Sequence, residues 1–202
     1  MKKLLLVDDD NNLITLLSSY LLSEGFVVNS ALDVTSAFML IKSSKPDLII
    51  TDIMLKKLDG YDFVKLIKLD YLLVDIPIIF LTAKGLTYDR IKGYNLGCHA
   101  YLTKPFNPNE LLAIIKNIFR QIELVQISSF QYFKSQNFRA PVFNTLTYRE
   151  KTILDLLLKG YMNKEIAVSL SMSTRNVEKY VSRLLNKTNT RNRTELVKTV
   201  LD

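Results

Sequence analysis

Short apolar runs alternate with helical stretches over the first 120 residues, and this alternation constrains the fold more than any other feature of the sequence. The runs carry apolar residues in succession, without polar alternation, which is typical of strands buried on both faces of a parallel sheet. They occupy residues 3–8, 26–30, 47–52, 77–82 and 100–103. This series of runs therefore predicts a five-stranded parallel sheet.

The stretches between these runs follow the helical period. Leu13, Leu17 and Leu21 recur at intervals of four residues, and Gly25 stands where a helix would stop. Comparable helical segments cover residues 33–43, 60–69, 86–95 and 107–120. Strands alternating with helices predict an α/β domain over residues 1–120, with a doubly wound, flavodoxin-like sheet. In such a sheet, ligands bind beyond the carboxyl ends of the strands.

Charge divides the chain into two parts. Residues 1–120 hold 14 Lys and Arg against 13 Asp and Glu, a net charge of +1. Residues 121–202 hold 13 against 7, a net charge of +6. A neutral module followed by a basic one favours a control domain joined to a domain that binds a polyanion.

Composition excludes several classes of protein. The single cysteine, Cys98, rules out an intrachain disulfide, and the single histidine, His99, rules out metal sites built from several His and Cys ligands. No stretch approaches the roughly 18 apolar residues of a membrane helix. The apolar run after Lys3 is too short for an export signal. We therefore expect a soluble intracellular protein without membrane contact.

The basic part of the chain shows a purely helical pattern from residue 145 onward. Thr147 and Glu150 form a capping box for a first helix, and a short helix follows from Asn163. Ser173 can cap a longer helix that reaches about Lys187, and a last helix covers residues 192–201. A short helix, a tight turn and a second helix in a basic domain predict a helix-turn-helix over residues 145–202. Residues 121–144 are interpreted as a linker whose first turn continues the preceding helix.

Acidic, hydroxyl and basic side chains follow the strands of the predicted sheet. Asp8 and Asp9 follow the first strand, Asp52 ends the third, Thr82 ends the fourth and Lys104 follows the fifth. Converging carboxylates repel one another, and a hard cation with oxygen ligands, such as Mg²⁺, resolves this. Asp52 is then a candidate nucleophile toward a phosphoryl group, with Lys104 and Thr82 holding the phosphoryl oxygens. Asp10 is interpreted as a helix cap.

These residues stand in motifs that resemble a known family. Val7 to Asp10, Asp52 with Asp59-Gly60, Leu81-Thr82-Ala83 and Tyr101 to Phe106 are similar to the receiver domain of two-component response regulators. The resemblance implies that Asp52 accepts phosphate from a sensor histidine kinase. It also implies a Mg²⁺ site of Asp9, Asp52 and the Met54 carbonyl, with Asp8 acting through water.

The same resemblance implies a switch. Tyr101 would turn inward when Thr82 moves toward the phosphoryl group. Lys56 departs from the family pattern, which commonly has proline at this position. That difference loosens the loop after Asp52 and adds a charge near the site.

The helix after Ser173 is amphipathic. Val177, Val181, Leu184 and Leu185 gather on one side, and the opposite side is polar. A polar strip of this kind fits the major groove of DNA. Its members are Arg175, Glu178, Lys179, Ser182, Arg183 and Asn186.

This region resembles the LuxR-type helix-turn-helix of the NarL/FixJ family. The matching segments are residues 146–150, 163–167, 177–184 and 191–197, and Tyr180 stands where the family often has histidine. The resemblance implies that Glu178, Lys179, Ser182 and Arg183 read the groove. Asn163 and Lys164 would contact phosphate. The last helix would form a dimer face with Leu196, Val197, Val200 and Leu201.

The sequence thus predicts a DNA-binding transcriptional regulator switched by receiver phosphorylation, active as a homodimer and in contact with RNA polymerase. It is not expected to be an enzyme beyond its own phosphorylation and dephosphorylation. An alternative is a phosphorylation-independent regulator of the same fold. A haloacid-dehalogenase-type phosphohydrolase would want Asp-x-Asp-x-Thr, but Asn12 occupies the Thr position after Asp8 and Asp10. An RNA-binding antiterminator would lack the helix-turn-helix.

The amino-acid composition gives an indication of the source of the chain. The sequence holds 19 Lys against 8 Arg, with 6 Gly and 5 Pro, as AT-rich genomes tend to produce. The chain also resembles the TctD-like regulators encoded in algal plastid genomes. Bacterial cytoplasm and plastid stroma are therefore both expected locations.

Overall fold

The computed structural model describes residues 1–56, 58–70, 72–135, 146–170 and 172–201. The chain forms two compact units, Met1–Phe119 and Arg120–Asp202. Within the described residues, no helix is both long and apolar enough to cross a membrane.

The first unit is a parallel sheet of five strands, as the sequence predicts. The strands follow the spatial order β2-β1-β3-β4-β5, and every neighbouring pair is parallel. Their bounds are β1 Lys3–Val7, β2 Val27–Ala31, β3 Leu48–Thr51, β4 Ile78–Thr82 and β5 Ala100–Thr103. In this order β1, β3 and β4 are interior strands, which explains their unbroken apolar runs.

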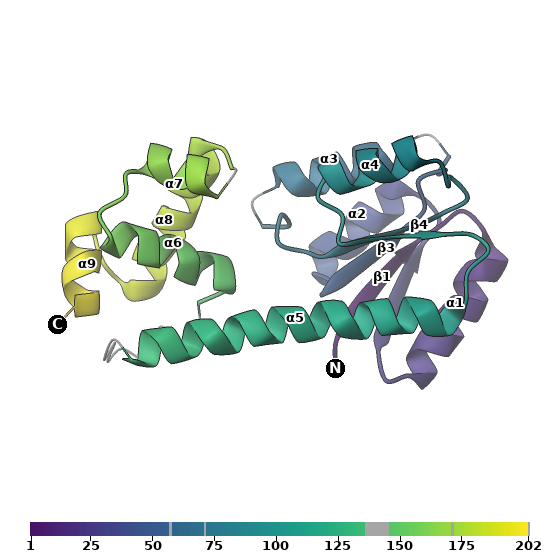
Figure 1. Cartoon of the computed structure of the whole chain (residues 1–202), viewed down its shortest axis with the longest axis horizontal. Coiled ribbons are helices and arrows are strands. Elements are labelled where there is room, and N and C mark those ends of the chain that lie inside the picture. The colour runs from purple at the N-terminus through teal and green to yellow at the C-terminus, as the bar shows by residue number, and fades with distance from the viewer. Residues whose placement is uncertain (57, 71, 136–145, 171, 202) are drawn as a thin grey trace. The chain divides into compact units, whose positions relative to one another are not determined.

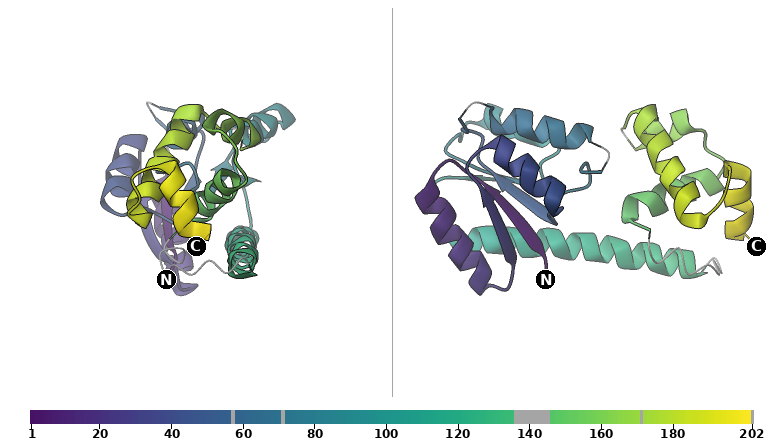
Figure 2. Two further views of the ribbon diagram at one scale, coloured as in Figure 1. Left: turned by 90° about the vertical axis from the view of Figure 1, so that its left-hand side faces the viewer. Right: turned by 180° about the vertical axis from the view of Figure 1, so that it is seen from behind.

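Helices cover both faces of the sheet. As Figures 1 and 2 show, α1 and α5 lie on one face, whereas α2, α3 and α4 lie on the other. Their bounds are α1 Asn11–Ser23, α2 Val34–Ser43, α3 Gly60–Leu69, α4 Thr87–Asn95 and α5 Pro108–Ser135. This arrangement confirms the predicted doubly wound fold and directs the carboxyl ends of all five strands to one edge.

Local signals in the sequence set where α1 begins and ends. The Asp10 side chain accepts hydrogen bonds from the backbone N–H groups of Asn12 and Leu13, so it caps the helix as expected. At the other end Gly25 takes φ +88°, a left-handed conformation that favours glycine. The helix is thereby confined between the end of β1 and the start of β2.

Helix α5 is longer than the sequence analysis predicts. We expected it to end about one turn beyond residue 120, but it continues to Ser135. Residues 121–135 contain neither glycine nor proline, so no residue interrupts the helical backbone there. Residues 136–144 of the predicted linker lie outside the described residues.

Besides the end of α5, the described residues of the second unit form four helices: α6 Tyr148–Leu158, α7 Asn163–Ser169, α8 Thr174–Thr188 and α9 Arg193–Leu201. The predicted capping box is present, because Thr147 Oγ1 accepts from the Glu150 N–H and Glu150 Oε2 accepts from the Thr147 N–H. Ser173 caps α8 by accepting from the Asn176 N–H. The fully buried side chains of the unit include Ile153, Leu154, Ile166, Val177, Leu184 and Leu196.

Two polar contacts hold these helices together. The Lys187 Nζ at the end of α8 lies 2.7 Å from Glu150 Oε2 at the start of α6. Arg193 Nη2 donates to the Leu157 and Tyr161 carbonyls at 3.2 and 2.7 Å, and so joins α9 to the end of α6. These contacts join α8 and α9 to α6.

Candidate functional site

The carboxyl edge of the sheet brings together three side chains from different strands. Val7 pairs with Thr51 across β1 and β3, so Asp8 and Asp52 emerge at the same level. Lys104 follows β5 and reaches both of them. Its Nζ lies 2.6 Å from Asp8 Oδ2 and 2.8 Å from Asp52 Oδ2. One ammonium thus joins two carboxylates that would otherwise repel each other.

The two carboxyl groups of this cluster are buried, and burial changes their pKa values. Asp8 and Asp52 are 5% and 6% exposed. Burial raises the pKa of Asp8 above its usual value, although the Lys104 ammonium opposes that rise. Burial also acts on Asp52, but hydrogen bonds from Lys104, the Met54 N–H and Thr82 bring its pKa below the usual value. Asp52 is therefore held ionised, as a nucleophilic carboxylate must be.

Backbone geometry fixes the second oxygen of each carboxylate. Asp8 Oδ1 accepts from the Asp10 N–H at 3.0 Å, and Asp52 Oδ1 accepts from the Met54 N–H at 2.9 Å. The start of α3 packs directly on the end of β3 at Gly60, where an added Cβ would lie 2.1 Å from the Asp52 carbonyl oxygen. Only glycine fits at that position. Gly60 belongs to the sequence motif that includes Asp52 and Asp59, and this close approach is the physical reason for glycine there.

Thr82 and Tyr101 lie on the neighbouring strands β4 and β5. Thr82 is fully buried, and its Oγ1 accepts from the Lys84 N–H at 3.3 Å. Tyr101 is half-buried, its ring centroid 5.8 Å from that of Phe80, and its hydroxyl donates to the Lys84 carbonyl at 2.9 Å. Both residues therefore contact Lys84, the second residue after β4. This shared contact gives a physical link between the two predicted switch residues.

Asp9 completes the acidic group and has a cation of its own. The Lys56 Nζ lies 3.4 Å from Asp9 Oδ2, and the Lys56 side chain is 81% exposed whereas that of Asp9 is 27% exposed. The extra charge that the sequence places near the site therefore lies directly on a predicted metal ligand.

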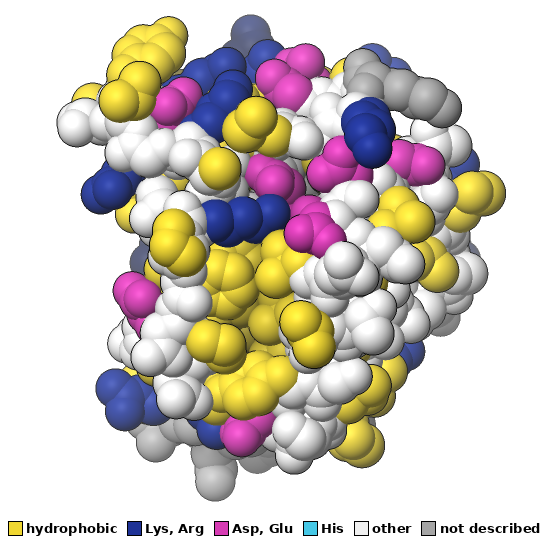
Figure 3. All heavy atoms as spheres, turned by 90° about the vertical axis from the view of Figure 1, so that its right-hand side faces the viewer, with side chains coloured by type: hydrophobic (Ala, Val, Ile, Leu, Met, Phe, Trp, Pro, Cys, Tyr) yellow, Lys and Arg dark blue, Asp and Glu magenta, His cyan; other side chains and the backbone are white. Residues whose placement is uncertain are grey.

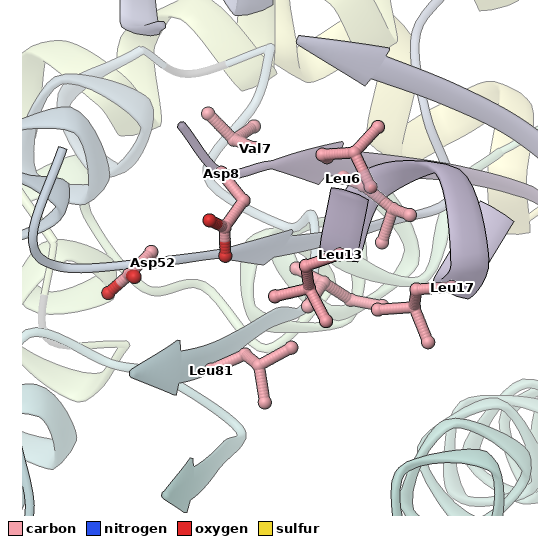
Figure 4. Close-up of a pocket in the computed structure, with 9 residues that line it drawn as sticks. Leu6, Val7, Asp8, Leu13, Leu17, Asp52 and Leu81 are labelled. Carbon is pink, nitrogen blue, oxygen red and sulfur yellow. The ribbon is translucent and has the colours of Figure 1, made fainter. Parts of the chain in front are cut away.

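A pocket of apolar side chains adjoins the carboxylates. Asp8 and Asp52 line it together with Leu13, Leu17 and Leu81. In Figure 4 the two carboxyl groups lie at one end and the leucines extend away from them. Figure 3 shows this end of the sheet as a hollow of hydrophobic side chains bordered by acidic and basic ones. The apolar surroundings lower the local dielectric and so strengthen the charge interactions of the cluster.

The carboxylate oxygens at this edge are of the chemical type that Mg²⁺ prefers. Across the part of the chain that the structure describes, no three His, Cys, Asp or Glu side chains already surround a common metal position. The Lys104 ammonium contacts Asp8 and Asp52, and the Lys56 ammonium contacts Asp9. Mg²⁺ commonly takes one or two carboxylates and keeps several waters, and carboxylate oxygens of this kind are the ligands that it prefers.

The polar strip of α8 lies open on the second unit. Arg175, Glu178 and Ser182 are exposed, as is Lys164 on α7, whereas Lys179 and Arg183 are half-buried. The apolar side differs slightly from the predicted one. Tyr180 is 1% exposed and joins Val177 and Leu184 in the core, while Val181 and Leu185 are half-buried. The polar side of the helix is thus partly open to solvent.

The predicted dimer face on α9 needs a correction. Leu196 and Val200 are 0% and 3% exposed, because they pack inside the unit. Side chains already buried within one copy cannot contact a second copy in this conformation. Val197 is half-buried, and the side chain of Leu201 lies outside the described residues.

Comparison with known proteins agrees with both parts of this description. Residues 4–116 match the response regulator receiver domain, and residues 144–200 match the luxR family of bacterial regulatory proteins. The chain therefore belongs to the response regulators that join a receiver domain to a LuxR-type helix-turn-helix.

Two relatives match this chain over nearly its whole length. The chain is 53% identical over 199 residues to a probable transcriptional regulator, ycf29, of Porphyra purpurea, covering 96% of this chain and 93% of the relative. It is 40% identical over 219 residues to response regulator Rre1 of Synechocystis sp., covering 98% and 95%.

A solved structure supports the fold of the first unit. A two-component response regulator from Clostridium difficile matches with a TM-score of 0.57 and 30% identity, over 60% of this chain and 98% of the other.

Proposed function

We propose that this protein is a transcriptional regulator in which phosphorylation of Asp52 controls DNA binding by the helix-turn-helix. The observation that carries the proposal is the contact of one ammonium, Lys104, with two buried carboxylates, Asp8 and Asp52, at the carboxyl edge of the sheet. DNA and a sensor histidine kinase are the partners that this pair of domains implies.

The chemistry follows from the positions of these groups. An oxygen of Asp52 attacks the phosphorus of a phosphohistidine, the P–N bond breaks, and the imidazole leaves while an acyl phosphate forms on Asp52. Asp52 loses its carboxylate charge when the acyl phosphate forms, so Lys104 then contacts a phosphoryl oxygen. The Thr82 hydroxyl donates to another phosphoryl oxygen, and its movement is passed to Tyr101 through their common neighbour, Lys84.

Mg²⁺ is the cofactor that we assign to this site. Asp9, Asp52 and the Met54 carbonyl would hold the ion, with Asp8 acting through water. When bound, Mg²⁺ neutralises the oxygens of the transferring phosphoryl group. Receiver domains generally use this ion for phosphorylation, and the carboxylate and carbonyl oxygens here have the chemistry that it prefers.

The output of the switch is DNA binding by a homodimer. A monomer presents a single α8, whereas a dimer spans two half-sites and gains from effective concentration. We assign base contacts to Arg175, Glu178, Lys179, Ser182 and Arg183. Phosphate contacts fall to Asn163 and Lys164. On α9, the described member of the predicted dimer face that keeps partial exposure is Val197.

Two further assignments complete the proposal. RNA polymerase is the partner expected of a regulator bound at a promoter. The plastid stroma is the location we favour, since the full-length relatives include probable transcriptional regulators of Porphyra purpurea and Pyropia yezoensis, and bacterial cytoplasm is the alternative. The family matches favour a regulator over a haloacid-dehalogenase-type phosphohydrolase.

Sedimentation and DNA titration test the switch. Incubation with acetyl phosphate and Mg²⁺ should raise both the dimer fraction and the affinity for duplexes recovered by mapping bound DNA in the source cell. The Asp52→Asn variant, treated in the same way, should show neither change. Equal dimer fractions and equal affinities with and without acetyl phosphate would identify a phosphorylation-independent regulator instead.

A further inference from the structure

Lys56 is the second cation at the acidic edge of the sheet. It stands in the loop between β3 and α3, and its Nζ lies 3.4 Å from Asp9 Oδ2. Lys104 lies on the other two carboxylates, at 2.6 Å from Asp8 and 2.8 Å from Asp52. Each of the three carboxylates therefore has an ammonium contact.

Lys56 changes the charge that a divalent cation meets. Three carboxylates and Lys104 alone carry a formal charge of −2, and Lys56 reduces it to −1. An ion that binds Asp9 must either displace the Lys56 ammonium or accept it as a close neighbour of like charge. Because the Lys56 side chain is 81% exposed, it can leave Asp9 at little cost, so the effect is a competition and not a block.

We propose that Lys56 competes with Mg²⁺ for Asp9 and thereby lowers the affinity of the site for Mg²⁺. Phosphorylation of this receiver then depends on the Mg²⁺ concentration. This inference rests on the proposed Mg²⁺ site. Repulsion between a monovalent and a divalent cation in a largely solvated setting corresponds to about a three- to tenfold loss of affinity at low ionic strength. Lys56 acts here as a positioning residue, because it touches a metal ligand and not the reacting phosphoryl group.

Mg²⁺ titration by isothermal calorimetry tests the competition directly on the full chain. Lys56→Gln removes the charge and should bind Mg²⁺ about three- to tenfold more tightly than the wild type. Lys56→Arg keeps the charge and should stay within about twofold of the wild type. Raising the salt concentration should reduce the difference between Lys56→Gln and wild type, since salt screens exposed charges.

Lys116→Gln is the matched control for total charge. In the wild type, Lys116 Nζ lies 3.0 Å from Glu24 Oε2. Glu24 follows α1 near the amino ends of the strands, so the variant loses the same charge away from the site. This variant should keep the wild-type Mg²⁺ affinity. If Lys56→Gln and the wild type bind Mg²⁺ equally, the inference about Lys56 is overturned while the metal site stands. Absence of Mg²⁺ binding in every variant would overturn the metal site itself, and the Lys56 inference with it.

Discussion

The two units of this molecule each contain a buried carboxylate joined to a lysine, and the two arrangements serve different ends. In the second unit, Glu150 Oε2 has two partners, the Lys187 ammonium and the Thr147 N–H, both at 2.7 Å. At the edge of the sheet, one Lys104 contacts both Asp8 and Asp52, and Lys56 contacts Asp9. The distances are similar, but the charge balance is not.

This difference teaches how to separate a structural ion pair from a reactive one. Glu150 and Lys187 neutralise each other, and the capping box uses the same carboxylate to begin α6. The receiver cluster keeps an excess of negative charge beside an apolar pocket. An excess of this kind has no structural use, but it attracts a divalent cation and a transferable phosphoryl group. The balance of charge, and not burial alone, therefore marks the site.

The largest expected effect is the loss of stability in Glu150→Ala. The change removes a capping bond and leaves Lys187 without its carboxylate, so the unfolding free energy of the second unit should fall by about 3 kcal/mol. Thermal unfolding measures it. Glu165→Ala is the matched control, because Glu165 Oε2 also accepts a backbone N–H, from Met162, but the residue is exposed, and it should cost about 1 kcal/mol or less.

The receiver counterpart of that experiment is Asp52→Asn. Neutralising Asp52 removes its ionic contact with Lys104, but it also relieves repulsion with Asp8 and keeps an oxygen for the Met54 N–H, so the first unit should lose clearly less stability than the second unit loses in Glu150→Ala. A loss comparable to that of Glu150→Ala would mean that both clusters are structural, and the contrast between the units would fail.

Two lysines of the second unit, Lys179 and Lys164, are assigned to DNA, whereas Lys187 pairs with Glu150 within the unit. Lys179 is assigned to base edges, so Lys179→Ala should weaken binding to the cognate duplex by about 1–3 kcal/mol and relax base preference there. Titration against cognate and scrambled duplexes measures both quantities. Equal losses on the two duplexes would make Lys179 a phosphate contact and the placement of α8 in the groove wrong.

Lys164 on α7 is assigned to phosphate, and its effect should be smaller and independent of sequence. Lys164→Ala should weaken every duplex alike and lower the slope of log affinity against log salt by about one. The titrations are repeated at several salt concentrations. A loss confined to the cognate duplex would contradict the assignment.

The smallest effect concerns His99 of the receiver. Its Nδ1 accepts the Ile78 N–H at 3.2 Å, and burial, with Lys68 nearby, lowers its pKa to about 4. The neutral ring is thus favoured in the fold, so stability is full above pH 6.5 and falls as the pH drops toward 4. Because the residue is exposed to solvent, we expect less than about 1 kcal/mol. Thermal unfolding of His99→Ala should lack this pH slope, and an unchanged slope would assign it to other groups.

The sequence was sufficient to predict the sheet, its helices and the residues at its carboxyl edge. Apolar runs identify buried strands, and the parallel order then brings Asp8, Asp52 and Lys104 to one place. The long end of α5 was missed because the absence of glycine and proline permits a helix without requiring one. The contact of Lys56 with Asp9 was also beyond reach, since a side chain on a loop has no periodic pattern to place it.

Burial within the helical unit was only partly predictable. The helical wheel places Val177 and Leu184 in the core correctly, but it does not identify Tyr180, whose ring is buried beside them. The same limit affected Leu196 and Val200, which were predicted to face a second copy and instead pack within one. An apolar stripe indicates that a helix is covered, but it does not say by which partner.

The position of the phosphoryl label tests the central claim most directly. The full chain is incubated with acetyl phosphate and Mg²⁺, and the modified residue is located by mass spectrometry. We predict that the label lies on Asp52, that it is lost in Asp52→Asn, and that removing Mg²⁺ abolishes it, because the carboxylates then repel the phosphoryl donor. Label that persists unchanged in Asp52→Asn would contradict the account.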